Sequence, residues 1–497
     1  MKKATAMSRW TRTAFSCSSL GLLVFLATPA TAQSDIAFSP DVYAARRSRL
    51  AEQAGEGVII LQGSDLTNPF GLVRQNSNFW YLTGVESPYA IAVMINTPPE
   101  RREILFVPER FQFAAVNFPV GEKSFREASW NQPVRRLSPG HQAEKATGFE
   151  ETRPIEEFSS WLKSIAGAEK IFLLIDPTHP YAPPGLSKPL TARQQFESDI
   201  TERFPKARIE NVAAIVQRMR EVKDVHEIAL MRRASQISAL GLIEIMNTVE
   251  PGMNDLEVAG RMEYVWKREG AQRIAFPPIV ASGTSALTLY SLRFENYNST
   301  DRIMRDGELL FIDYGAAEVN MYASDVCRTL PVSGTFTSQQ RKYYDVVLEA
   351  QDAALAVIRP GAKMIDVVRA AARVFLAHGL DAKEDIESLG PENVWGVMPS
   401  PTHFVKRGLG LGPSPASNGI RVRDLGHHIG LEALDRADKS RPLEAGMVFT
   451  VEPKLYMPDL GMAIMIEDVI LVTEGGYENL SASAPRTADE IERAMRR

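Results

Sequence analysis

The stretch that decides the fold is Leu309-Leu310-Phe311-Ile312-Asp313-Tyr314-Gly315, an apolar run that leads into a carboxylate. It is followed by Tyr322–Thr329, a second strand-like run that carries Asp325. The midpoint between the two aspartates falls at Val319, so a hairpin that turns there would place the carboxylates opposite each other, with Cβ atoms about 5 Å apart. Two bare carboxylates at that distance repel each other, and they persist by sharing a proton or by holding a cation.

The same pattern returns later in the chain. Met447–Val451 leads to Glu452, Met462–Ile466 leads to Glu467, and the midpoint of the two glutamates falls in the turn-like Pro458–Gly461. Acidic residues on strands usually face solvent, but two pairs that are each symmetric about a turn predict a divalent metal site. We therefore expect four carboxylates, from two hairpins, to face one cleft.

An internal repeat with an offset of 109 residues suggests that these hairpins belong to equivalent halves. Glu250-Pro251-Gly252 precedes the helical pattern Glu257–Arg268, and Arg359-Pro360-Gly361 precedes the helical pattern Asp366–His378. Helix breakers also recur by chance, so an accidental repeat is the alternative. The capping-box pattern Thr337–Gln340 predicts where the helix that opens the second copy begins.

An imidazole often accompanies such carboxylates, and Leu425–Gly430 supplies two adjacent histidines. We take His427 as the metal ligand and His428 as its doubtful neighbour. A lone histidine is more often a core or surface residue, so this interpretation depends on the four carboxylates. One imidazole with four carboxylates can hold two divalent ions about 3.5–4 Å apart, the geometry that activates a bridging water for hydrolysis.

The first half of the chain has the pattern of an α/β domain, in which short apolar runs alternate with helix-like stretches such as Glu156–Ile165. The apolar runs, which suit buried strands, are Val58–Leu61, Phe79–Leu82, Ile91–Ile95, Ile104–Val107 and Ile171–Ile175. Proline and polar residues gather between 177 and 205, and a charged helical run follows from about 212. At roughly 150 residues per domain, we expect an amino-terminal domain over 33–211 and a second domain over 212–497.

Residues 1–32 have the layout of a cleaved secretory signal, with basic residues, an apolar run, and Ala30-Thr31-Ala32 as the cleavage site. The apolar run is shorter than the ~20 residues that span a bilayer, so we expect no stable membrane anchor and a periplasmic or secreted protein. Residues 1–32 hold four of the 56 Lys+Arg and none of the 61 Asp+Glu, which leaves 52 against 61, a net charge of −9. This charge argues against a nucleic-acid partner.

Cys327 is the only cysteine beyond the signal segment, because Cys17 lies within it, so no intrachain disulfide can form. The composition of 44% hydrophobic and 24% charged residues is that of a globular protein stabilised by its core. Cys327 lies between Val326 and Arg328 in a strand-like run, where we expect a small buried hydrophobe rather than a nucleophile.

Together these motifs resemble the aminopeptidase P and prolidase family, two-domain relatives of methionine aminopeptidase. The resemblance implies an α/β creatinase-like amino-terminal domain followed by an α+β pita-bread metallopeptidase domain. It extends over nearly the whole chain after residue 32. The segments that carry it are Asn78–Gly84, Ile279–Gly283, Ile312–Gly315, Ser324–Thr329, Phe336–Gly361, Gly426–Gly430, Thr450–Pro453 and Ile466–Asp468.

The resemblance also implies a metal site and a reaction. The ligands would be Asp313, Asp325, His427, Glu452 and Glu467, with Asp325 and Glu467 bridging two ions, and Glu452 would also act as the general base. The hairpin between the two aspartates is one residue longer than in the family, which predicts a bulge near the turn. The implied activity is removal of the amino-terminal residue ahead of proline from peptide substrates. Carboxylates with one imidazole suit Mn²⁺, with Co²⁺, Zn²⁺ or Fe²⁺ as alternatives, and we expect a homo-oligomer.

The chain departs from the family at four positions. The family has three histidines where this chain has Leu434, Arg423 and Tyr290, and an arginine where it has Met465. Tyr290 is then our candidate for the group that donates to the oxyanion. Other candidates are His403, His428 and Arg423. These departures leave two alternatives open, a hydrolase of another amide or dipeptide and a pseudoenzyme that binds metal or peptide without turnover.

Overall fold

The computed structural model describes residues 38–65, 74–108, 119–120, 123–124, 137–175, 190–287, 302–380, 425–438 and 440–496. Across these ranges no helix is long and apolar enough to cross a membrane. The expected signal segment 1–32 lies outside the described residues, and so do Tyr290, His403 and Arg423. The signal peptide therefore stays a prediction.

The first part of the chain forms a six-stranded mixed sheet in the order β6-β3-β2-β1-β7-β8. Its strands are β1 (Gly57–Gln62), β2 (Ile91–Thr97), β3 (Glu100–Val107), β6 (Glu151–Pro154), β7 (Lys170–Leu173) and β8 (Arg208–Asn211). Two short strands pair separately, β4 (Pro119–Val120) and β5 (Lys123–Ser124). The helices of this part are α1 (Pro40–Ala54), α2 (Ser77–Thr83), α4 (His141–Thr147), α5 (Phe158–Trp161) and α6 (Ala192–Arg203).

Both faces of this sheet are buried, and successive side chains alternate between the two faces. Ile59 and Leu61 pack in a core that also contains residues of α1, whereas Val58 and Ile60 pack in a second core with Phe158 of α5. A sheet covered on both faces requires continuous apolar runs rather than alternating ones. The expected α/β amino-terminal domain is therefore confirmed, with most of its apolar runs in strands.

The expectation of a strand at Phe79–Leu82 is wrong, because these residues belong to helix α2. The side chain of Asn76 caps the helix by accepting from the backbone N–H of Phe79, and Gly84 ends it in the left-handed conformation. A Cβ at Gly84 would lie 2.6 Å from the ring of Tyr43, so glycine is required there. A run of only four apolar residues carries no periodicity that separates helix from strand. The helix-like stretch 156–165 is likewise divided, into η1 (Ile155–Glu157), α5 and η2 (Leu162–Ile165).

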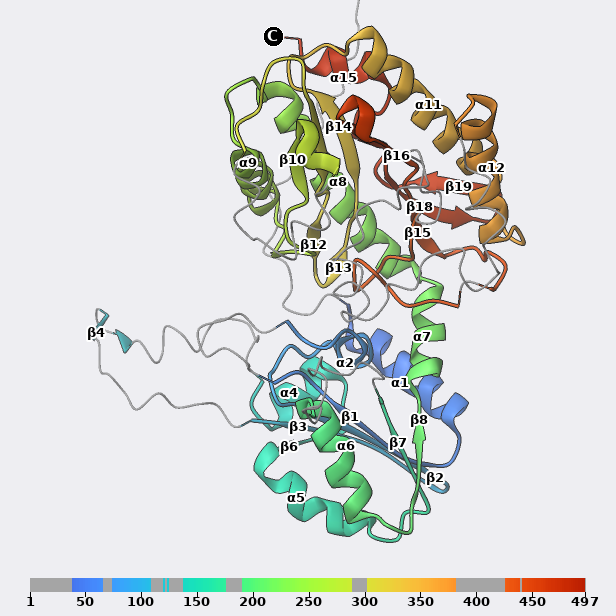
Figure 1. Cartoon of the computed structure of the whole chain (residues 1–497). Helices are drawn as coiled ribbons and strands as arrows, with labels where there is room; N and C mark the ends of the chain where they lie inside the picture. The colour runs from blue at the N-terminus through green and yellow to red at the C-terminus, as the bar shows by residue number, and fades with distance from the viewer. Residues whose placement is uncertain are drawn as a thin grey trace, which may run out of the picture.

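The second domain contains two similar halves, each made of a helix pair and a hairpin (Figure 1). The first half comprises α8 (Val225–Thr248), α9 (Asp255–Arg268), β9 (Arg273–Ile274), β10 (Val280–Ser282), η3 (Gly283–Leu287), β11 (Leu309–Asp313), β12 (Ala317–Val319), β13 (Tyr322–Ala323) and β14 (Cys327–Pro331). The second half comprises α11 (Ser338–Leu355), α12 (Met364–Ala377), β15 (Val448–Val451), β16 (Lys454–Met457), η6 (Pro458–Leu460), β17 (Met462–Met465), β18 (Asp468–Thr473), β19 (Gly476–Asn479) and α15 (Ala488–Ala494). α8 packs on α9 as α11 packs on α12, which confirms the repeat, and the Thr337 capping box is also confirmed.

Helix α7 (Ala213–Glu221) lies at the junction of the two domains in Figure 1, and the expected boundary at 211/212 falls between β8 and α7. Polar contacts join the domains there. Arg46 of α1 lies 2.8 Å from Asp224 and 3.3 Å from Glu227, and the Tyr81 hydroxyl donates to the carbonyl of Met219. Arg74 pairs with the fully buried Glu318 of β12 at 2.8 Å. The amino-terminal domain is thus held against the β12–β13 side of the second domain.

Candidate metal centre

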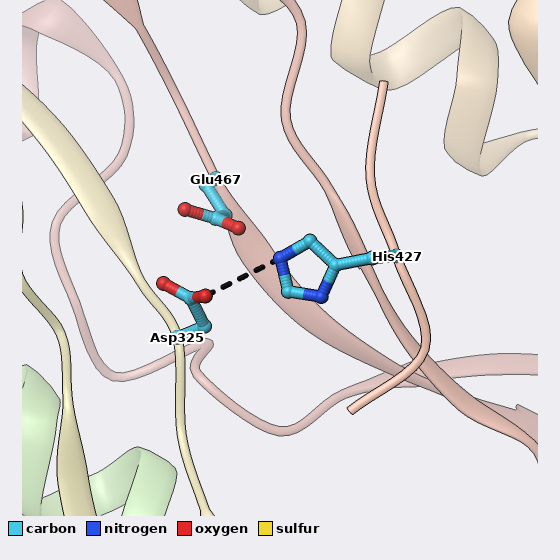
Figure 2. Close-up of side chains that lie close together, drawn as sticks. All are labelled: Asp325, His427 and Glu467. Atoms are coloured by element: carbon cyan, nitrogen blue, oxygen red, sulfur yellow. Dashed lines mark ion pairs between the residues drawn. The ribbon is translucent and has the colours of Figure 1, made fainter. Parts of the chain in front are cut away.

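Asp325, His427 and Glu467 come together in the second domain, and each offers a ligand atom within 4.8 Å of those of the other two. The three side chains point toward one another from three separate segments of the chain (Figure 2). The Nε2 atom of His427 lies 3.4 Å from Oδ2 of Asp325. All three are among the metal ligands predicted from the sequence.

The cluster lies where the hairpins of the two halves meet. The backbone of Cys327, at the start of β14, exchanges two hydrogen bonds with that of Glu467, with N···O distances of 3.3 and 3.1 Å. Asp325 lies two residues before Cys327. This bridge therefore places a carboxylate of the first half beside a carboxylate of the second, as the repeat predicted.

The second hairpin has the predicted register. Val451 pairs with Asp468 and Lys454 pairs with Met465, so the two glutamates between these pairs stand opposite each other. The turn of this hairpin contains η6. The prediction that Glu452 and Glu467 are symmetric about residues 458–461 is confirmed.

The first hairpin differs from the prediction, because Asp313 pairs with Cys327 and not with Asp325. The chain turns at Asn320 and Met321, whose φ values are +46° and +72°, rather than at Val319. Two consecutive left-handed residues are typical of a tight two-residue hairpin turn. The two aspartates are consequently diagonal neighbours rather than directly opposed.

A one-residue shift in register separates the inner and outer parts of this hairpin. Val319 pairs with Tyr322 in the inner part, and that register would place Asp313 opposite Arg328 rather than its observed partner Cys327. The extra residue is accommodated beside Gly315, whose Cβ would lie 2.5 Å from Val326 backbone atoms if it had one. The predicted bulge is present, but it lies next to the metal cluster instead of near the turn.

The orientation of His427 is fixed by contacts with Thr450 and with the backbone of His428. The backbone N–H of His427 donates to Thr450 Oγ1 at 3.1 Å, and its carbonyl accepts from the backbone N–H of Thr450 at 2.8 Å. Its Nδ1 lies 3.2 Å from the carbonyl of His428, and a carbonyl can only accept, so Nδ1 carries the proton. The other ring nitrogen, Nε2, is thereby left to face the carboxylates, the usual arrangement of a metal-binding histidine. His428 is buried beside Phe449 and is not part of the cluster.

Asp313 and Glu452, the other two expected ligands, border the three-residue cluster. Asp313 ends β11, is buried, and adds to the charge that Asp325 experiences. Glu452 lies with Oε1 3.9 Å from Nε2 of His427, while its Oε2 accepts from Nζ of Lys454 at 2.7 Å. Three of the five expected ligands thus form the cluster, and the other two lie beside it.

Burial and mutual repulsion perturb the acid groups of the site. Burial raises the pKa of Asp325 to about 6, and the neighbouring charge of Asp313 acts in the same direction. Burial also raises the pKa of Glu467, reinforced by the charge of Asp325, and it raises the pKa of Glu452 in spite of Lys454. For His427, burial lowers the pKa, but the hydrogen bond to Asp325 outweighs it and the pKa is raised. Clustered carboxylates with raised pKa values are typical of a site that a cation would stabilise.

The residues present fit a divalent metal. Oδ1 of Asp325 and Oε2 of Glu467 are buried and have no hydrogen-bond partner among the described residues. A buried carboxylate oxygen without a partner is costly, and a bound cation removes that cost. Oxygen ligands with one imidazole are the donor set that first-row divalent ions accept.

Lys454 is the functional neighbour that sequence reasoning missed. It is the cross-strand partner of Met465, the residue that stands where the family resemblance expects an arginine. A positive side chain therefore enters the site from the neighbouring strand. The symmetric register of the second hairpin, which was predicted, would have located it.

A buried network behind the cluster fixes the two strands of the second hairpin. Arg328, fully buried, donates to the Glu467 carbonyl at 2.7 Å and to Asp468 Oδ1 at 2.8 Å. Nε2 of Gln351 donates to the carbonyl of Val451 at 3.0 Å and to Asp468 Oδ2 at 3.1 Å. Sequence reasoning did not assign these residues, because a buried arginine or glutamine has no local signature in the sequence.

The remaining candidates divide between core, surface and undescribed residues. Cys327 is fully buried, and burial raises the pKa of its thiol, which confirms the expected small core residue. Met465 is buried as well, whereas Leu434 is 39% exposed. Tyr290, the proposed oxyanion donor, lies outside the described residues.

Comparisons with known proteins agree with this fold and site. Metallopeptidase family M24 matches residues 229–474, and the aminopeptidase P amino-terminal domain matches residues 43–173. The Xaa-Pro aminopeptidase of Escherichia coli (strain K12) is 30% identical over 479 residues, which cover 90% of this chain and 96% of that protein. The Xaa-Pro aminopeptidase of Haemophilus influenzae (strain ATCC 51907 / DSM 11121 / KW20 / Rd) is 31% identical over 446 residues, covering 87% and 90%.

Solved structures give the same result. Aminopeptidase P from E. coli with the inhibitor Pro-Leu superimposes with a TM-score of 0.72 at 28% identity, over 92% of this chain and 98% of that one. A putative aminopeptidase P from Bacillus anthracis gives a TM-score of 0.73 at 25% identity, with the same coverage. The two matched domains define the class, a metallopeptidase with a pita-bread domain. Within that class, the chain belongs to the aminopeptidase P family.

Proposed function

We propose that this protein is an exported Xaa-Pro aminopeptidase, which releases the amino-terminal residue ahead of proline with a centre of two divalent ions. The observation that carries the proposal is the buried cluster of Asp325, His427 and Glu467, in which two carboxylate oxygens have no hydrogen-bond partner among the described residues. Support also comes from relatives named Xaa-Pro aminopeptidase, which align with 90% and 87% of the chain. Mn²⁺ is our first choice of ion because most of the proposed ligands are oxygen atoms.

Five side chains would hold the metal: Asp313, Asp325, His427, Glu452 and Glu467. A bound divalent pair would make water a stronger nucleophile and polarise the substrate carbonyl. Side-chain contacts orient these ligands before a metal ion binds. The Nδ1 contact of His427 keeps Nε2 facing the carboxylates, and Lys454 holds one oxygen of Glu452.

Glu452 is our candidate for the general base. Its Oε2 is engaged by Lys454, so Oε1, which faces His427, is the oxygen that could accept a proton from the attacking water. Tyr290 would complete the site by donating a hydrogen bond to the oxyanion, a role proposed from the family resemblance.

The test is an activity assay with metal-stripped protein and peptides of the form Xaa-Pro-Xaa. We expect no release of the first residue without metal, and release after Mn²⁺ is added, with no cleavage of matched peptides that carry alanine in place of proline. Release from the alanine peptides or from other amides alone would favour a hydrolase with a different substrate. Metal uptake without hydrolysis of any amide would favour a pseudoenzyme.

Export is a separate part of the proposal. The basic residues, apolar run and Ala30-Thr31-Ala32 of the first 32 residues support it. Amino-terminal sequencing of the protein expressed in a bacterial host should find a chain that begins at Gln33 in the periplasmic fraction. An uncleaved chain in the cytoplasm would contradict export and leave the enzymatic proposal intact.

A further inference from the structure

Lys454 places a positive charge inside the proposed metal site. It begins strand β16 and is 7% exposed. Its Nζ lies 2.7 Å from Oε2 of Glu452. The side chain of Glu452 is itself 9% exposed, so this ion pair is largely shielded from water. A shielded pair interacts more strongly than one at the surface.

The ion pair occupies Oε2 of Glu452, an oxygen that a metal ion could otherwise use as a ligand. Glu452 has two oxygens, and Lys454 takes one of them while the other faces His427. By contrast, Asp325 and Glu467 each have a buried oxygen with no hydrogen-bond partner in the described part of the chain. An ion that binds through Asp325 and Glu467 breaks no such contact, whereas an ion that draws on both oxygens of Glu452 must displace Lys454.

The charge of Lys454 also disfavours binding of a second divalent ion. An ammonium and a divalent cation repel each other, and in a buried site this repulsion is only weakly screened. Four carboxylates would balance two divalent ions, and Lys454 adds one positive charge that this balance does not require. The second ion to arrive therefore meets a site that is already less negative.

We propose that Lys454 makes the two metal-binding steps unequal, so that one divalent ion binds tightly and the other, which draws on Glu452, binds weakly because Lys454 holds one oxygen of that carboxylate and repels the ion. This inference rests on the proposed function, since it concerns the same metal centre. It assigns Lys454 as a positioning residue for Glu452, one that sets the metal occupancy of the site rather than contacting the substrate.

The test is calorimetric titration of metal-stripped protein with Mn²⁺, comparing the parent chain with Lys454→Met and Lys454→Arg. Methionine keeps most of the length of the side chain and removes the charge, whereas arginine keeps the charge. We expect two classes of site in the parent, and in Lys454→Met a weaker class that tightens by about tenfold or more, since a tenfold change is a modest effect for a buried charge. Lys454→Arg should retain the weak class.

Two results would overturn the inference: an unchanged or weaker second class in Lys454→Met, or equal tightening in Lys454→Arg. Lys454→Gln serves as a second neutral variant if circular dichroism shows that the methionine variant is misfolded. A parent that binds two Mn²⁺ ions equally refutes the role of Lys454 and leaves the proposed function standing. A parent that binds no divalent ion refutes both.

Discussion

Glu467 shows at the scale of one residue how this site is built. Its backbone pairs with Cys327 of the other half, its carbonyl accepts from Arg328, and its carboxylate meets Asp325 and His427. The main chain is thus fully used for structure, while Oε2 of the side chain has no hydrogen-bond partner within the described ranges. Because the backbone of Glu467 is held firmly, its carboxylate is fixed in the position from which it would bind a metal ion.

The first prediction concerns Tyr290. If its hydroxyl donates to the oxyanion, Tyr290→Phe should lower kcat and kcat/KM together by about 10²-fold or more, because the interaction forms only in the transition state. Metal content should be unchanged, since the residue is not a proposed ligand. A phenol with a pKa near ~10 would add no histidine-like step to the acidic limb of the pH-rate profile.

Steady-state kinetics on an Xaa-Pro peptide, with metal analysis of the same samples, checks this prediction. Full activity in Tyr290→Phe would transfer the role to another group, and His403 and His428 would be the next residues to replace.

Among the helices, α8 depends on the residue that caps its start. Asp224 caps the helix by accepting from the N–H groups of His226 and Glu227, and Glu227 returns a contact to the N–H of Asp224. The same carboxylate pairs with Arg46 of the other domain. The side chain of Asp224 therefore caps α8 of the second domain and also joins this helix to the amino-terminal domain.

The second prediction separates these two roles of Asp224. Asn caps about as well as Asp, whereas Ala does not, so Asp224→Ala should unfold with about 1 kcal/mol less free energy than Asp224→Asn. Chemical denaturation at pH 7 measures the difference. Equal stability of the two variants would show that the cap contributes nothing measurable.

The third prediction concerns pH. Burial alone would raise the pKa of Asp224, but the backbone N–H of Glu227 and the charge of Arg46 outweigh it and lower the pKa. A lowered pKa means that the ionised form stabilises the fold above the unfolded pKa of about 3.9, and that this contribution is lost as pH falls through the folded value. Asp224→Asn should therefore lose less stability than the parent between pH 5 and pH 3. Parallel stability curves for the two proteins would contradict this assignment.

The hairpins show how far sequence patterns reach at this scale. The second hairpin could be predicted in register, because its glutamates are symmetric about Pro458–Gly461 and the strands continue without interruption. The first could not, because the left-handed turn at Asn320 and the shift beside Gly315 are two local features that together move Asp313 away from Asp325. The number of residues between the two aspartates shows how long the hairpin is, but not where the chain turns or where the register shifts.

Other parts of the site and the fold were beyond reach for a different reason. Arg328 and Gln351 are fully buried, yet in the sequence each looks like any polar residue. Burial is decided by which strand lies across from them, and that is a tertiary property. The apolar run at 79–82 was misassigned as a strand because the caps Asn76 and Gly84, not the run itself, determine that it is helical.

At the scale of the whole molecule, Arg46 connects the domains. It lies over the ring of Tyr81, with 4.1 Å from its guanidinium carbon to the ring centroid, and it pairs with Glu227, which is 2% exposed. Burial raises the pKa of Glu227, so the ionised carboxylate depends on this partner and on the hydroxyl of Tyr322 at 2.8 Å. The interface therefore includes a buried carboxylate whose charge is compensated mainly by Arg46, with a smaller contribution from Lys223.

The fourth prediction follows from that contact. Arg46→Met should lower the free energy of unfolding by roughly 3–5 kcal/mol, because it leaves a buried carboxylate without its cation. Arg49→Met, at an exposed position on the same helix, is the matched control and should change stability by less than about 0.5 kcal/mol. Equal stability of the two variants in urea would mean that the domains do not depend on the Arg46 contact.

The decisive measurement is the number of Mn²⁺ ions bound per chain at saturating free Mn²⁺, determined by equilibrium dialysis so that a weakly bound ion is also counted. We predict about two ions per chain in the parent, and close to none in Asp325→Ala or Glu467→Ala, because each carboxylate would contribute to both ions. Circular dichroism should show that both variants remain folded. Undiminished occupancy in either folded variant would contradict the assignment of this cluster as the metal centre.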